Sequence, residues 1–95
     1  MRAEPLTYRQ LEFLLSELGY HLLRAEGEPR VFRNPDFNAV SVLPAAPPEE
    51  AARPHHLITL RKVSIEKGIV DEPTFDALLA KAHCYDGKLL VPNRG

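Results

Sequence analysis

Residues 20–43, YHLLRAEGEPRVFRNPDFNAVSVL, contain three short apolar runs separated by two segments rich in turn-forming residues. Runs of β-branched and aromatic residues favour strands, and clusters of Gly, Pro, Asp and Asn favour tight turns. Three strands joined by short turns predict an antiparallel meander. The expected strands are residues 20–25, 30–34 and 39–43, and the expected turns are residues 26–29 and 35–38.

A helix is expected before this meander. Thr7 followed by Gln10 matches a capping box, in which two side chains satisfy free backbone N–H groups at a helix start. Apolar residues then recur at helical spacing over residues 8–18, and Gly19 supplies a left-handed stop. Because the apolar stripe is wide, we expect this helix to pack on a flat surface such as the sheet.

Two further helices are expected after the meander. Apolar spacing from Leu57 predicts a second helix to about Lys67, ended by Gly68, and Asp71 is a good N-cap for a third helix. The resulting order, α-β-β-β-α-α, predicts one α+β domain over residues 1–95. We expect a three-stranded antiparallel sheet with the helices packed on one of its faces.

Composition limits the classes of function. A chain of 95 residues with 44% hydrophobic and 26% charged residues is ordinary for one small globular domain. Its net charge of −1 argues against a uniformly basic nucleic-acid-binding surface and leaves room for a local basic patch. A single cysteine, Cys84, excludes an internal disulfide framework and a CxxC metal site. With no signal-peptide pattern and no membrane-spanning apolar stretch, we expect a cytoplasmic protein without a membrane partner.

Two segments remain outside these elements. Residues 44–54 hold four of the nine prolines and are expected to form an extended, mobile loop. Residues 86–92 fit either an added edge strand or a disordered end, and the sequence does not decide between them. We call residues 44–54 the proline-rich segment.

Three short motifs follow one another along the chain: Leu18-Gly19-Tyr20, Gly27-Glu28-Pro29, and VFRNPD at residues 31–36. Together with the order of elements, they resemble the HicA-like toxins of bacterial toxin–antitoxin pairs, also called YcfA-like proteins. The resemblance covers about residues 7–68 and leaves residues 69–95 as an additional helix and tail. It implies a double-stranded-RNA-binding-like fold and a protein that acts on RNA.

The resemblance breaks at one residue. Members of the family carry Gly-Ser-His where this chain has Gly27-Glu28-Pro29, and that histidine is the catalytic residue of RNA cleavage. An imidazole can move the proton of a ribose 2′-OH near neutral pH. Pro29 has neither an ionisable side chain nor a backbone N–H. We therefore expect a pseudoenzyme that has lost cleavage activity and retains binding of RNA or of a partner.

Arginines of the first two strands and their turn are candidate RNA contacts. Arg24, Arg30 and Arg33 could form the phosphate-contacting patch that the resemblance implies. Arg30 could bind a phosphate but could not act as a base, because an arginine side chain has a pKa above about 12. The alternative is that all three are solvated strand positions, since two glutamates in the same turn partly cancel their field.

His55 and His56 follow Arg53 at the expected start of the second helix, where amide donors favour a phosphate. One hypothesis makes Arg53 a further RNA contact and either histidine the displaced general base of an active endoribonuclease. The alternative is a helix-start pair with one ring in solvent and one packed on the loop. Adjacent helical residues point in different directions, so we expect the two rings to diverge and to bind no metal. No motif indicates a cofactor.

A third hypothesis is a protein partner. An open sheet edge or the proline-rich segment could dock an antitoxin-like chain, or a second copy of this chain, by strand addition. The near-zero net charge suits such a partner, because a protein needs no strong positive field. Binding that is insensitive to salt would favour a protein over RNA.

Overall fold

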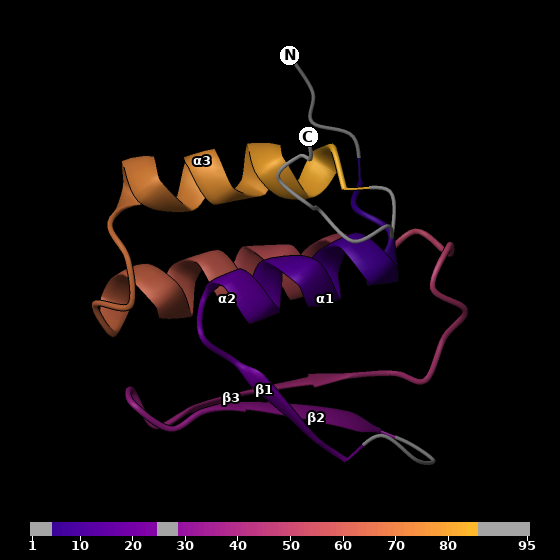
Figure 1. Cartoon of the computed structure of the whole chain (residues 1–95), viewed down its shortest axis with the longest axis horizontal. Coiled ribbons are helices and arrows are strands. Elements are labelled where there is room, and N and C mark those ends of the chain that lie inside the picture. Colours follow the sequence, from indigo (N-terminus) through magenta and orange to yellow (C-terminus); the bar gives the residue numbers. More distant parts are fainter. Residues whose placement is uncertain (1–4, 25–28, 86–95) are drawn as a thin grey trace, which may run out of the picture.

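The computed structural model describes residues 5–24 and 29–85. Its elements follow the predicted order, and the α+β class with a three-stranded antiparallel sheet is confirmed. The elements are α1 (Tyr8–Glu17), β1 (His21–Arg24), β2 (Arg30–Asn34), β3 (Ala39–Leu43), α2 (Pro54–Glu66) and α3 (Glu72–His83). Figure 1 shows all three helices on the same side of the sheet, with α1 and α2 between the sheet and α3. This arrangement is consistent with a double-stranded-RNA-binding-like fold.

The sheet has the order β1-β2-β3, so β2 is central and the other two strands are edges. Along β2, Phe32 and Asn34 are buried toward the helices, whereas Arg33 is exposed on the opposite side. Side chains alternate between faces along a strand, so the exposed residues of neighbouring strands share this uncovered side. We call it the open face.

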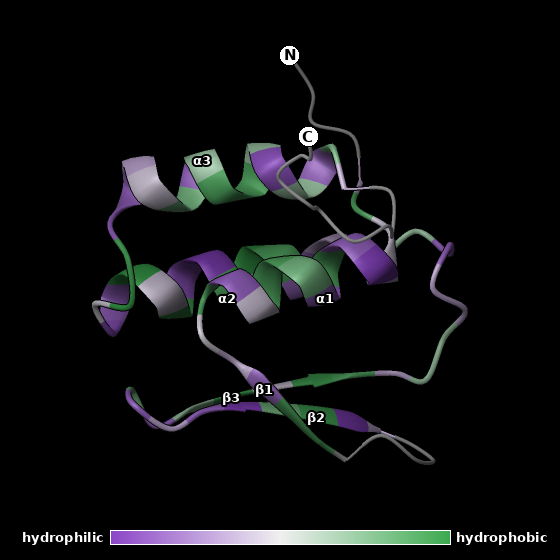
Figure 2. Cartoon of the chain, in the orientation of Figure 1, coloured by the Kyte–Doolittle hydropathy of each residue, from purple (hydrophilic) through white to green (hydrophobic). Residues whose placement is uncertain are grey.

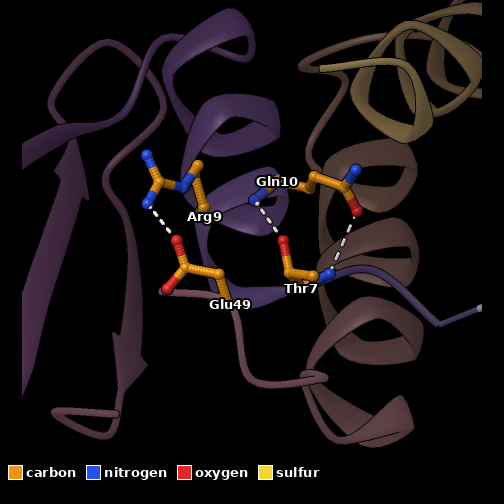
Figure 3. Close-up of polar contacts among 4 residues, drawn as sticks. All are labelled: Thr7, Arg9, Gln10 and Glu49. Carbon is orange, nitrogen blue, oxygen red and sulfur yellow. Dashed lines mark hydrogen bonds and ion pairs between the residues drawn. The ribbon is translucent and has the colours of Figure 1, made fainter. Parts of the chain in front are cut away.

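Helix α1 begins where its sequence signal places it. The Thr7 hydroxyl accepts from the Gln10 N–H at 3.1 Å, and the Gln10 side chain accepts from the Thr7 N–H at 3.1 Å (Figure 3). The helix ends before Gly19, whose φ of +97° lies in the region that favours glycine. Asp71 likewise caps α3 by accepting from the Thr74 N–H. These predicted capping signals are confirmed. Each of them acts within one helical turn.

The core joins α1 to the helix-facing side of the sheet and to α3. Leu14 and Leu15 of α1 and Phe75 of α3 are fully buried, and Phe32 of β2 is 5% exposed. Figure 2 shows hydrophobic residues, in green, on the helices and on the strands of the sheet. Among the described residues, no helix is long and apolar enough to cross a membrane.

The proline-rich segment is tied to the start of α1. The Tyr8 N–H donates to the Glu50 carbonyl at 2.9 Å, and the Arg9 N–H donates to the Pro48 carbonyl at 2.9 Å. The Arg9 and Glu49 side chains add an ion pair (Figure 3). Residues 44–53 form no helix or strand, and these contacts hold them against the start of α1. The first N–H groups of a helix have no partner within the helix, and here the carbonyls of the proline-rich segment accept their hydrogen bonds.

One predicted boundary differs by a residue, and one prediction concerns residues that the structure does not describe. The first strand begins at His21, one residue later than expected, because Tyr20 is buried in the turn that leaves α1. The alternatives for residues 86–92 lie outside the described residues.

Candidate functional site

The first candidate region is the start of β2, where the resemblance would place cleavage chemistry. Pro29 is exposed directly before this strand. The guanidinium of Arg30 is held by the Glu12 carboxylate of α1, with Nε 2.8 Å from Oε2 and Nη2 3.0 Å from Oε1. The Arg30 and Glu12 side chains are only 26% and 31% exposed. In this bidentate ion pair, the carboxylate neutralises the guanidinium charge that would otherwise attract a phosphate.

Arg30 and Arg33 do not form one patch. They are three positions apart on β2, so they lie on opposite faces of the sheet. Arg33 is exposed on the open face, between His21 of β1 and Val40 of β3 in the strand register. Arg24 pairs with Val31 at the end of β1, and its side chain lies outside the described part of the structure.

The second candidate region is the start of α2. His55 and His56 line a cleft of about 240 Å³ between this helix and the edge of β3. Hydroxyl-bearing residues of three different segments, Tyr20, Ser41 and Thr59, line the same cleft. The other lining residues are Val40, Val42, Leu60 and Val63. We call this the α2–β3 cleft.

The two imidazole rings lie together, not apart. Their centroids are 4.1 Å from each other with an angle of 42° between the ring planes. The Tyr8 ring meets His56 edge-on, with the centroids 5.8 Å apart. The expectation of diverging rings is wrong because side-chain torsions bring the rings together although the Cα–Cβ bonds of neighbouring helical residues diverge.

The titratable side chains at this helix start, Arg53, His55 and His56, are all basic. Burial, the neighbouring His55 and the neighbouring Arg53 lower the pKa of His56, in that order of effect. Burial raises the pKa of the Tyr20 phenol, so this hydroxyl stays protonated at neutral pH. Arg53 is the N-cap residue of α2 and makes no capping side-chain bond. Its guanidinium therefore adds to the positive end of the helix dipole.

Arg53 itself lines a different, apolar cleft. This cleft has a volume of about 300 Å³ and lies between the residues before α1 and the first turns of α2. Its other lining residues are Pro5, Leu6, Leu11, Ala52, Pro54, Leu57 and Ile58. It offers no second polar group to work with Arg53, so the α2–β3 cleft is the richer site in chemistry.

The α2–β3 cleft is better suited to holding an anion than to cleaving RNA. The start of the helix dipole, with Arg53 as its N-cap residue, attracts a phosphate, and an imidazole N–H can donate a hydrogen bond to it. General acid–base cleavage needs two groups placed on either side of the reacting atoms, within hydrogen-bond reach. Instead, the two imidazoles lie ring against ring at 4.1 Å. Within residues 5–24 and 29–85, no three His, Cys, Asp or Glu side chains gather closely enough to hold a metal ion.

Sequence reasoning identified the histidines and missed the groups around them. Ser41 and Thr59 reach the cleft from β3 and α2, and nothing in the spacing of either residue signals this. Glu12 was also missed, although its partner Arg30 had been singled out. The alternation of faces along a strand could have separated Arg30 from Arg33 in advance.

Comparisons of the chain with models of protein families, with curated proteins and with solved structures find no match.

Proposed function

We propose that this chain is a HicA-like domain that binds RNA through its phosphates and does not cut it. The observation that carries this proposal is the position of His55 and His56 at the start of α2, where they line a cleft with hydroxyl groups and directly follow Arg53 and Pro54. The exposed Cys84 fits a reducing compartment, and we place the protein in the bacterial cytoplasm.

Loss of cleavage follows from the chemistry of Pro29 and Arg30. Pro29 cannot accept the proton of a ribose hydroxyl, and Arg30 is already neutralised by Glu12. The histidine pair is a poor substitute, because its rings lie against each other, with centroids 4.1 Å apart, instead of on either side of a reacting group.

The size of the α2–β3 cleft fits a backbone contact. At about 240 Å³ it is smaller than the roughly 300–1,000 Å³ of pockets that enclose a drug-sized ligand. A phosphate with part of its ribose would fill it, with the hydroxyls of Ser41 and Thr59 available as hydrogen-bond partners. Contacts of this kind position RNA without reading its sequence.

The test is an RNA-binding and cleavage assay at two salt concentrations, with end-labelled single-stranded and hairpin RNA. We expect a mobility shift that weakens with salt, and no cleavage. Arg53→Ala should weaken binding and reduce the slope of log affinity against log salt by about 0.7, the loss of one phosphate contact on a single strand. Arg61→Ala is the matched control, because Arg61 lies on the same helix but pairs with Asp76 of α3.

Two results would change the conclusion. Cleavage that disappears in a His55→Ala, His56→Ala double variant would make the α2–β3 cleft the active site of an endoribonuclease. Absence of any RNA shift at low salt would overturn RNA binding and leave a protein partner, such as an antitoxin-like chain, as the ligand to seek.

A further inference from the structure

Strand β3 has an open and regular edge. It pairs with β2 through all five of its residues, and within the described residues no strand lies along its other side. The opposite edge strand, β1, is interrupted by a register shift between Leu22 and Arg24. In an antiparallel edge strand, every second residue turns its N–H and C=O groups away from the sheet. Strand β3 thus offers a row of backbone donors and acceptors.

The side chains of β3 do nothing to discourage pairing. The strand has no charged residue and no proline, the two devices with which proteins commonly block free edges. Val40 and Val42 are 56% and 49% exposed on the open face. Figure 2 shows β3 as mostly hydrophobic.

The order of residues in β3 suits pairing with itself. The strand reads Ala-Val-Ser-Val-Leu, so the three central residues are the same in both directions. If two copies pair antiparallel about a two-fold axis at Ser41, Val40 lies opposite Val42 of the second copy on the open face. Ala39 then lies opposite Leu43 on the helix side, a small residue facing a large one. β-Branched pairs on one face are among the favourable cross-strand pairs of antiparallel sheets.

We propose that β3 is a self-association edge, at which two copies of this chain join their sheets into one six-stranded sheet. The two-fold pairing uses the same strand in both copies, as an isologous dimer requires. Because each copy carries a net charge of only −1, electrostatic repulsion between the copies is small.

The α2–β3 cleft adjoins the strand that would pair. It is lined by Val40, Ser41 and Val42 of β3 and by Thr59 and Val63 of α2, whose side chains can meet the second copy. A second copy here would compete with a phosphate for the cleft, so the test of self-association contains no RNA.

The first experiment measures molar mass by sedimentation equilibrium over a wide range of chain concentration. We expect a monomer–dimer equilibrium. Val42→Lys should weaken the dimer about tenfold or more, because the lysine replaces one valine of each Val40–Val42 pair and places a charge there. Ile58→Lys is the matched control, since Ile58 is 65% exposed on α2 and does not line the cleft. A wild-type chain that stays monomeric throughout, or a dimer that Ile58→Lys disrupts and Val42→Lys does not, would overturn the proposal.

A second experiment tests the register and does not rely on a charged variant that folds. In a Cys84→Ser background, Val40→Cys chains mixed with Val42→Cys chains should form a mixed disulfide under mild oxidation. Each variant alone should form far less, because identical positions are diagonal across the axis and too far apart for a disulfide. If one of the two variants is uniformly labelled with ¹⁵N, mass spectrometry distinguishes the three products. The statistical mixture that random pairing gives would contradict the two-fold axis at Ser41.

Discussion

Glu12→Gln should loosen the protein slightly and improve its binding to RNA. The Glu12 carboxylate makes two hydrogen bonds to the Arg30 guanidinium, at 2.8 and 3.0 Å. Ion pairs near the surface typically contribute 0.2–1 kcal/mol, and this pair, with side chains 26% and 31% exposed, belongs near the upper end. We expect the free energy of unfolding to fall by about 0.5–1 kcal/mol in urea denaturation.

The gain in binding comes from the released guanidinium. One additional phosphate contact on single-stranded RNA steepens the slope of log affinity against log salt by about 0.7. Glu17→Gln is the matched control, because Glu17 is also on α1, is 30% exposed and pairs with Lys81 of α3. Both variants remove one negative charge. Equal salt slopes for the two variants would refute the reasoning, because only Glu12 holds an arginine of the predicted RNA patch.

Three further predictions test the turn, the histidine pair and the fold. Pro29→His should restore cleavage of end-labelled RNA, with Pro29→Ala as the control, and an inert histidine variant would contradict the resemblance. By NMR titration, the imidazole of His56 should have a pKa below its ordinary 6.5, and His55→Ala should raise that pKa, since His55 helps to lower it. Gly19→Ala should cost about 1 kcal/mol or more, measured by urea denaturation, because φ is +97° and the new Cβ would lie 3.1 Å from a buried asparagine amide. Gly68→Ala should cost less, since φ is +75° and no atom lies within 4 Å of the new Cβ.

The helix caps and the turn between β2 and β3 were predictable because their signals are local. Thr7 and Gln10 act within one turn of α1, and Asp71 caps α3 three residues before its partner. The turn at residues 35–38 ends at Asn38, which takes a φ of +53° as asparagine does more readily than most residues. Each of these residues satisfies a backbone requirement of its own neighbours, so the sequence alone determines the outcome.

The contacts that define the candidate site were not predictable in the same way. Arg30 and Glu12 are 18 residues apart, and their meeting depends on how α1 crosses the sheet. The proline-rich segment looked free because its composition disfavours regular structure, but its carbonyls answer the unpaired N–H groups of α1. Composition describes what a segment does alone, and here a distant helix end sets its position.

Because side chains alternate between faces along β2, the arginines of this strand do not form one site, and the start of α2 remains the candidate site. Arg30 faces the helices and meets Glu12, whereas Arg33 faces away on the open face. A phosphate chain passing the start of β2 could therefore not meet both guanidinium groups at once. The start of α2 has no such restriction, because Arg53 and two histidines share one helical turn and no described acidic side chain pairs with them. If the domain kept RNA binding after losing the histidine at position 29, the start of α2 is where its electrostatics favour the phosphate.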